Sequence, residues 1–323
     1  MNIIVIGLGS MGKRRIRLIK KIDPTISIFG IDSREDRRDE VSKLYSIRTY
    51  SSIENIDGGV DVAFICTSPL SHANLINECL NKRINVFTEI NLVNDMYDDN
   101  IKLAHDNNLI LFLSSTQLYK REMQKIKEIC SPVKQYNYIY HVGQYLPDWH
   151  PWETYNDYFI SNKRTNGCRE ILAIELPWIV DLFGKVVGKN VIKSKITKLN
   201  IDYNDNYIIQ LEHENDNKGV LIVDVVSPKA VRKLEIYSED KYISWNGTPD
   251  TLIEYDKSNK RDVSYCLYDD VDKVEGYSEL IVENAYEEEI RAFLNAIRGD
   301  KKDILHTFEK DKEILKLIDD IEG

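Results

Sequence analysis

The chain has 323 residues, of which 42% are hydrophobic and 30% are charged, and its formal net charge is −10. This length suits about two domains, because single hydrophobic cores stop growing near this size, and no apolar run reaches the ~20 residues that span a membrane. The acidic balance argues against nucleic acid and anionic membranes as partners. The first residues run into a strand without a basic leader, so we expect a cytoplasmic protein. The five cysteines form an odd set without C-x-x-C spacing, so we expect neither disulfide bonds nor a zinc site.

The opening stretch predicts a dinucleotide-binding turn. Residues 3–6 are apolar and β-branched, which favours a buried strand of a parallel sheet. Three glycines follow at the spacing G-x-G-x-x-G, where the first permits a tight bend, the second lets the backbone approach a pyrophosphate, and the third lets a helix pack on the sheet. The helix N-terminus then presents amides to that anion. The residues expected at the pyrophosphate are Gly7, Gly9, Ser10, Met11 and Gly12. The alternative is a structural strand-to-helix turn that happens to be rich in glycine.

The second predicted strand, residues 26–31, ends in an acidic residue that indicates the choice of cofactor. Asp32 stands where a carboxylate would bind the adenosine ribose hydroxyls. It would repel a 2′-phosphate, which favours NAD over NADP. Arg34 could hold that phosphate if Asp32 turned away, but a solvated first turn of the next helix is the interpretation we favour for it.

Strands and helices then alternate, which predicts a doubly wound parallel sheet with right-handed crossovers. The expected strands are 61–66, 84–88 and 109–113, and the expected helices are 71–81 and 95–106. Ligands of such sheets bind beyond the carboxyl ends of the strands. Thr67, Pro69 and His72 follow one of these strands and Glu89 follows the next, so we expect them beside the cofactor.

From about residue 118 the pattern changes, which predicts domains at 1–118 and 119–323. The strand-like segments are 133–144, 191–203, 207–212, 219–227, 231–237 and 242–245. Turns rich in Asn, Asp, Gly and Pro indicate that most of these strands are antiparallel. A helix over 167–183 would cover one face of the sheet, and Pro177 should kink or restart it. Two helices, 279–298 and 306–320, close the chain.

Four segments together resemble the glucose-fructose oxidoreductase, inositol dehydrogenase and MocA (Gfo/Idh/MocA) family. They are the first strand-turn-helix, C-T-S-P-L-S-H at 66–72, F-T-E-I-N at 87–91 and E-E-E-I-R-A-F-L-N-A-I at 287–297. The resemblance implies a Rossmann domain followed by an α+β domain whose open, mostly antiparallel sheet mediates homodimer or homotetramer contacts. It also implies NAD or NADP as cofactor and hydride transfer to or from a carbon of a sugar or cyclitol.

The same resemblance assigns roles to single residues, and two departures from the family pattern follow. The residues that match family positions at the cofactor are Gly7, Gly9, Gly12, Asp32, Thr67, Pro69, His72 and Glu89. The Glu-Lys-Pro triplet of the family reads Glu89-Ile90-Asn91 here, so the usual active-site lysine is absent. The usual histidine of the second-domain helix falls on Ile174, or on Trp178 in a shifted alignment.

Without that pair, a proton-transfer group must come from elsewhere, because hydride transfer from an alcohol requires the hydroxyl proton to leave. A positioned base contributes about 10²–10⁴-fold to this step. His150 is the first candidate, and Asp148, Glu153 or Glu175 could orient it or serve as the base. Tyr119 and Tyr155 are weaker candidates. The alternative for His150 is a packed or surface histidine between two prolines and the tryptophans Trp149 and Trp152, which could themselves stack on a sugar ring.

Glu175 lies on an otherwise apolar helix surface, where an unpaired carboxylate would be costly. It is therefore a candidate for the substrate cleft. The alternative is an ion pair with Arg164 or Arg169.

Three functions remain open. The first is an NAD-dependent oxidoreductase acting on a sugar, activated or acidic, and the stretch 143–153 resembles a family branch of bacterial surface-sugar and nonulosonate pathways. The second is a dinucleotide-binding protein without dehydrogenase activity, motivated by Ile90 and Ile174. The third is reduction of a C=C or C=N bond with a proton from solvent.

Overall fold

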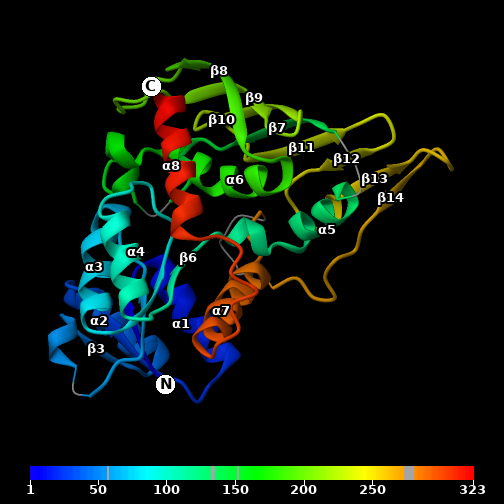
Figure 1. Ribbon diagram of the computed structural model, residues 1–323. Coiled ribbons are helices and arrows are strands. Elements are labelled where there is room, and N and C mark those ends of the chain that lie inside the picture. The colour runs from blue at the N-terminus through cyan, green and yellow to red at the C-terminus, as the bar shows by residue number, and fades with distance from the viewer. Residues whose placement is uncertain (57, 132–134, 151–152, 273–279) are drawn as a thin grey trace. The chain divides into compact units, whose positions relative to one another are not determined.

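The structure is a computed structural model that describes residues 1–56, 58–131, 135–150, 153–272 and 280–323 (Figure 1). It divides into two compact units, each made of two stretches of chain. The first unit comprises Met1–Thr116 and Tyr286–Lys316, and the second comprises Gln117–Ala285 and Leu317–Gly323.

The first unit contains a six-stranded, entirely parallel sheet in the order β3-β2-β1-β4-β5-β6. Its strands are β1 (Asn2–Ile6), β2 (Ser27–Ile31), β3 (Arg48–Tyr50), β4 (Val62–Ile65), β5 (Asn85–Thr88) and β6 (Leu111–Leu113). Its helices include α1 (Ser10–Ile22), α2 (Glu35–Tyr45), α3 (Pro69–Asn81) and α4 (Tyr97–Asp106). The order reverses between β1 and β4, which is the topology of a dinucleotide-binding Rossmann fold. The predicted doubly wound sheet is confirmed.

Helix α7 (Glu283–Ile297) supplies a missing part of the first unit's core. Phe64, Phe87 and Phe112 form a row on adjacent strands, with ring centroids 4.7 and 5.1 Å apart. Phe293 of α7 packs against all three at 5.4–5.5 Å. Because these apolar contacts tie the helix to the parallel sheet, residues 286–316 group with the first unit, whereas the predicted division at residue 118 left them in the second.

The second unit contains an eight-stranded, mostly antiparallel sheet in the order β14-β13-β12-β11-β7-β10-β9-β8, in which β7 and β10 are parallel. Its strands are β7 (Asn137–Gly143), β8 (Val186–Ser194), β9 (Asn206–His213), β10 (Lys218–Asp224), β11 (Val231–Tyr237), β12 (Tyr242–Trp245), β13 (Ile253–Asp256) and β14 (Arg261–Ser264). Its helices include α5 (Arg121–Cys130) and α6 (Gly167–Phe183), and α8 (Phe308–Glu322) has residues in both units.

Helix α6 lies against one face of this sheet (Figure 1), as predicted. Tyr138 stacks on Phe183 with centroids 4.1 Å apart, and Tyr140 meets Trp178 edge-on at 5.2 Å. These contacts define the inner face of the sheet. The helix runs through Pro177 as one element, so of the two predicted outcomes the restart does not occur and the kink stays a prediction.

One predicted strand has other bounds than expected, and the start of another cannot be compared. The strand expected over 191–203 is β8, which starts at Val186 and ends at Ser194. Residues 132–134, which include the start of the strand expected at 133, lie outside the described residues.

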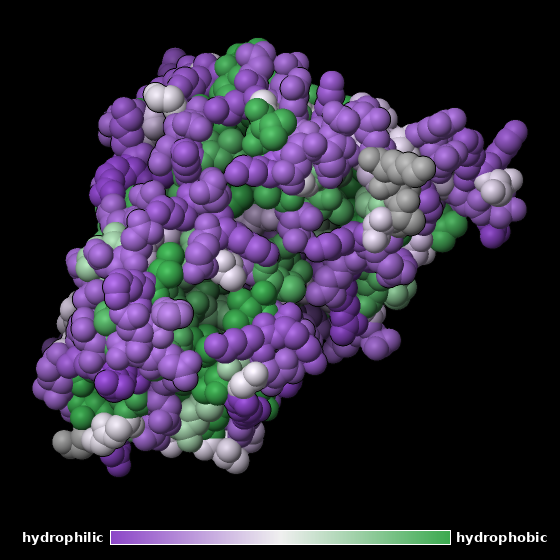
Figure 2. Space-filling model, viewed as in Figure 1, coloured by the Kyte–Doolittle hydropathy of each residue, from purple (hydrophilic) through white to green (hydrophobic). Residues whose placement is uncertain are grey.

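The surface view in Figure 2 shows a predominantly hydrophilic face, with hydrophobic residues emerging between the polar ones. None of the helices in the described part of the chain combines the length and apolar composition needed to cross a membrane.

Candidate cofactor and catalytic sites

The glycine turn between β1 and α1 has the shape that a pyrophosphate requires. Gly7 has φ +92°, and a Cβ there would lie 2.7 Å from the Cys66 carbonyl oxygen. A Cβ on Gly12 would lie 1.9 Å from the Gly7 carbonyl oxygen. A Cβ on Gly9, in contrast, would meet nothing closer than Arg37 Nη1 at 3.6 Å. Two glycines are therefore required by the fold, and the third leaves its backbone open to a ligand.

Helix α1 begins directly behind this opening, at Ser10. Its N-cap is Gly9, which has no side chain to cap the helix, and its first turn, which includes Met11, carries no acidic residue. The N-terminal partial positive charge of the helix is therefore not opposed by a carboxylate from that turn. The turn and the helix together fit the pyrophosphate of a dinucleotide.

Asp32 follows β2 and is held in a fixed position. Its Oδ2 accepts a hydrogen bond of 2.8 Å from the Leu8 amide, and its Oδ1 accepts one of 2.9 Å from the Arg34 amide. Each carboxylate oxygen has a further lone pair for a ribose hydroxyl. The Arg34 guanidinium pairs with Asp36 at 2.5 Å. Because the arginine is engaged away from Asp32, this arrangement favours NAD.

His72 links the loops that follow β4 and β5. Its Nε2 lies 2.9 Å from the Thr67 carbonyl oxygen, and its Nδ1 lies 2.7 Å from Asn91 Oδ1. Pro69 is the first residue of α3 and starts the helix that carries this histidine. Burial lowers the pKa of His72, so the ring is neutral near pH 7. With a partner at each ring nitrogen, His72 is placed to hold the two loops together.

Glu89 belongs to a buried ion cluster. Its Oε1 accepts from Arg15 Nε at 2.6 Å, and its Oε2 accepts from Arg15 Nη2 at 3.0 Å. The same Nη2 lies 2.9 Å from Glu289 Oε2, on α7. Arg15 and Glu289 are fully buried. Glu89, the first residue of the triplet, is thus bound by Arg15, which was not among the residues predicted from the sequence.

His150 lies in the second unit, and its carboxylate partner is Glu153 and not Asp148. Its Nδ1 is 2.7 Å from Glu153 Oε1, and its ring stacks on Tyr158 at 4.4 Å. Asp148 ends a short 3₁₀ turn and is exposed. In the described part of the chain, it is Glu153 that pairs with the imidazole. Trp152, considered above for stacking on a sugar, lies outside the described residues.

Glu175 is fully buried on α6 and accepts three hydrogen bonds shorter than 3 Å. The donors are Tyr140 Oη at 2.8 Å, Trp178 Nε1 at 2.7 Å and Arg232 Nη2 at 2.5 Å. The expected ion pair therefore exists, but its partner is Arg232 of β11. Arg169 instead pairs with Asp319 at 2.6 Å and with Glu322.

Arg232 belongs to this cluster and Lys120 is a second buried cation of the same unit. Neither residue was singled out from the sequence. Lys120 is 4% exposed, its Nζ donates to the Leu280 carbonyl oxygen at 3.1 Å, and it lies 5.6 Å from the centre of the Trp245 ring. Burial, followed by the charge of Arg232, lowers the pKa of Lys120 to about 7.

One signal could have found Arg232, because it shares its strand face with the buried Leu234 and Ile236. A charged residue in register with buried ones indicates an inward-pointing charge. Lys120 lies in the run Leu-Tyr-Lys-Arg, where apolar and polar residues do not alternate. The sequence therefore did not indicate that this lysine is buried.

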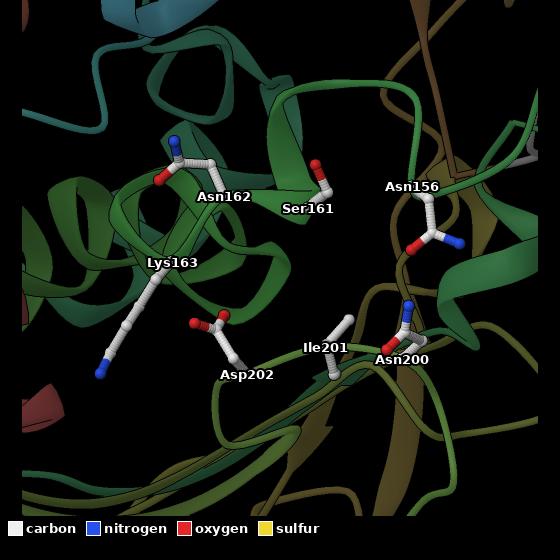
Figure 3. Close-up of a pocket in the computed structure, with 7 residues that line it drawn as sticks. All are labelled: Asn156, Ser161, Asn162, Lys163, Asn200, Ile201 and Asp202. Carbon is white, nitrogen blue, oxygen red and sulfur yellow. The ribbon is translucent and has the colours of Figure 1, made fainter.

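A separate polar hollow of about 550 Å³ lies in the second unit (Figure 3). Its lining residues are Asn156, Ser161, Asn162, Lys163, Asn200, Ile201 and Asp202. None of the predicted site residues lines it. Among the described residues there is also no group of three or more His, Cys, Asp and Glu side chains placed to hold a metal ion.

Comparison with known proteins gives one partial sequence match and broad structural likeness. Residues 1–113 match the GFO_IDH_MocA family, described as an oxidoreductase family with an NAD-binding Rossmann fold. Myo-inositol 2-dehydrogenase of Thermotoga maritima is 32% identical over 133 residues, which cover 40% of this chain. The match also spans only 40% of the length of that relative.

Solved structures match the whole chain. UDP-N-acetylglucosamine 3-dehydrogenase GnnA from Acidithiobacillus ferrooxidans has a TM-score of 0.77 at 17% identity, over 100% of this chain and 96% of its own. A probable dehydrogenase from Thermotoga maritima has a TM-score of 0.76 at 20% identity, over 98% and 94%. At such identities the likeness shows the fold alone. The family match thus covers the first 113 of the 323 residues, which are the residues of the parallel sheet and its helices.

Proposed function

We propose that the protein is an NAD-dependent oxidoreductase that transfers a hydride between nicotinamide and a hydroxyl-bearing carbon of a sugar-type substrate. The observation that carries the proposal is the turn at Gly7, Gly9 and Gly12 with the fixed Asp32 carboxylate behind it. The backbone at Gly9 and the amides of Ser10 and Met11 would hold the pyrophosphate, and Asp32 would hold the ribose. NAD, when bound, supplies the hydride acceptor.

We propose the substrate class from the substrates in the names of similar proteins. One relative is a myo-inositol 2-dehydrogenase and one structural neighbour a UDP-N-acetylglucosamine 3-dehydrogenase. A polyhydroxylated ring is common to both names. We extend this to an activated or acidic sugar, in surface-polysaccharide or nonulosonate metabolism, on the likeness of the stretch 143–153.

The proton-transfer group has competing candidates in the second unit. His150 with Glu153 or Asp148 stays a prediction, and its partial exposure leaves it open to a substrate. Glu175 is engaged by three donors, which supports a positioning role over proton transfer.

A calorimetric titration with NAD, NADH, NADP and NADPH tests the cofactor half. We expect NAD and NADH to bind, and Asp32→Ala to weaken NADH binding by about 10-fold or more, because lost hydrogen bonds to a charged group cost about 1.5–3 kcal/mol. Arg34→Ala is the matched control and should leave NADH affinity unchanged. A sugar and sugar-nucleotide screen followed at the nicotinamide absorbance band then tests the activity. Binding of none of the four cofactors would reject the proposal.

A second candidate is a dinucleotide-binding protein without dehydrogenase activity. Ile90 at the usual lysine position and Ile174 at the usual histidine position favour it. It predicts cofactor binding without turnover, and sugar oxidation that appears only in Ile90→Lys. Turnover by the unmodified protein would exclude it, and reduction of C=C or C=N substrates alone would support the third function considered above.

A further inference from the structure

A buried polar network connects the loops at the predicted cofactor site with helix α8, inside the first unit. Its members are each at most 4% exposed, and they are His72, Asn91, Tyr97, His306 and Asp311. His72 Nδ1 lies 2.7 Å from Asn91 Oδ1, and Asn91 Nδ2 donates to Tyr97 Oη at 2.8 Å. Tyr97 Oη donates to Asp311 Oδ2 at 2.6 Å, and His306 Nε2 lies 3.1 Å from Asp311 Oδ1.

Tyr97 joins the two ends of this network. It is the first residue of α4, and its ring packs against Phe308, the first residue of α8, with centroids 4.8 Å apart. Beside it, Lys312 Nζ donates to the two carboxylate oxygens of Asp98 at 2.6 and 2.7 Å. The start of α8 therefore holds the start of α4 by a ring contact, a buried hydrogen bond and a surface ion pair. The loop between β5 and α4 thus has a fixed end.

Asn91 carries this fixed position towards the loop after β4. It is the third residue of the triplet that reads Glu-Lys-Pro in the family, and a proline side chain has no donor or acceptor. The Asn91 amide instead bridges His72 and Tyr97. On the other side of its ring, His72 Nε2 lies 2.9 Å from the Thr67 carbonyl oxygen. Because a buried polar group without a partner is costly, the network favours one arrangement of the loops after β4 and β5.

These two loops lie on the side of β1 where the nicotinamide half of a dinucleotide would run. The sheet order is β2-β1-β4-β5, and Asp32, which would hold the adenosine ribose, follows β2. The pyrophosphate would lie at the glycine turn after β1, so the second nucleotide would pass beyond β4 and β5. Thr67 follows β4 and Glu89 follows β5. The network therefore acts on the nicotinamide side of the site.

We propose that Tyr97 and Asp311 are positioning residues for the nicotinamide half of the cofactor, acting through Asn91 and His72 on the loop at Thr67. The inference rests on the proposed function, because it requires that the first unit binds NAD. Tyr97 and Asp311 need not contact the cofactor themselves. They fix the segments that would, so the affinity for nicotinamide depends on α8.

Tyr97→Phe tests this role, because it removes the hydroxyl that joins the network and keeps the ring that packs on Phe308. We expect it to weaken NADH binding about 3–10-fold, the equivalent of one lost hydrogen bond. ADP-ribose contains the adenosine and the pyrophosphate but no nicotinamide. Its affinity should not change, because Asp32 and the glycine turn are outside the network. Calorimetric titration measures both ligands.

Tyr268→Phe is the matched control. Tyr268 Oη also donates to a buried carboxylate, Glu122 Oε2, at 2.6 Å. Tyr268 belongs to the second unit and is not one of the predicted cofactor residues. Both substitutions should lower the melting temperature to a similar extent, and only Tyr97→Phe should change NADH affinity.

Two substitutions of Asp311 repeat the test at the other end of the same hydrogen bond. Asp311→Asn keeps one carbonyl acceptor for the network, and Asp311→Ala keeps none. We therefore expect Asp311→Asn to retain more NADH affinity than Asp311→Ala, with ADP-ribose affinity unchanged in both.

The two ligands separate failure of this inference from failure of the proposed function. Wild-type NADH affinity in Tyr97→Phe, or an equal loss of NADH and ADP-ribose affinity, would overturn the positioning role and leave the proposed function intact. An unmodified protein that does not bind NADH would instead reject the proposed cofactor site, and this inference with it.

Discussion

Arg15 and its two carboxylates show how much of the first unit depends on one buried charge. The guanidinium lies 4.5 Å from the centre of the Phe87 ring and donates to Glu89, Glu289 and Ser114. These partners come from the end of β5, from α7 and from the residue after β6. A fully buried arginine is tolerated only while such partners neutralise it, so Glu89, the residue after β5, has a structural role in the fold.

Glu89→Gln should therefore destabilise the protein strongly. Removing one partner of a buried ion pair costs about 3–5 kcal/mol in the free energy of unfolding, and denaturant titration measures it. Glu40→Gln is the matched control, because Glu40 pairs with Lys13 at 2.7 Å on the surface and such pairs contribute about 0–1 kcal/mol. Equal losses in the two variants would contradict the structural role of Glu89.

The glycine turn permits a prediction at the scale of a single strand-turn-helix element. Gly9→Ala should leave the melting temperature near wild type, because its Cβ meets only the flexible end of Arg37 at 3.6 Å. It should nevertheless weaken NADH binding, since the methyl group occupies the pyrophosphate's approach. Gly12→Ala should lower the melting temperature, because its Cβ would overlap the Gly7 carbonyl. Calorimetry and thermal unfolding of both variants measure the contrast, and unchanged NADH affinity in Gly9→Ala would count against the turn as the cofactor site.

Elements with a strong pattern were predictable, and those without one were not. The strand at 3–6 and the glycines after it follow from β-branching and spacing alone. Strands β13 and β14 have the sequences I-E-Y-D and R-D-V-S. They contain too few apolar residues to show the alternation of apolar and polar residues that predicts a strand. For the candidate site, Asp32 could be singled out from its place after a strand, whereas the burial of Lys120 depends on neighbours that are distant in the sequence.

At the scale of the whole molecule, the outer face of the second unit's sheet supports self-association. α6 covers the inner face, while apolar side chains on the other face are solvent-exposed. They are Ile139, Ile192, Ile208, Tyr237, Tyr242 and Tyr255. Several exposed apolar residues on one face of a sheet are typical of protein interfaces. We propose a homodimer or homotetramer through this face.

Ile139→Lys should weaken that assembly, because Ile139 lies on the central strand β7 and would place a charge in a desolvated interface. Sedimentation velocity should show a shift towards monomer. Leu44→Lys, at an exposed position of α2 in the first unit, is the control and should not change the mass. A monomeric wild type would refute the proposed interface.

The path of the chain also has a consequence for synthesis on the ribosome. The aromatic row of the parallel sheet is complete once Phe112 has emerged, but Phe293, which packs on it, follows only after the bulk of the second unit. At roughly 5–20 residues per second, the interval is on the order of 10 s. During that time the nascent sheet presents an uncovered hydrophobic face, so the stretch that is translated first completes its core only near the end of synthesis.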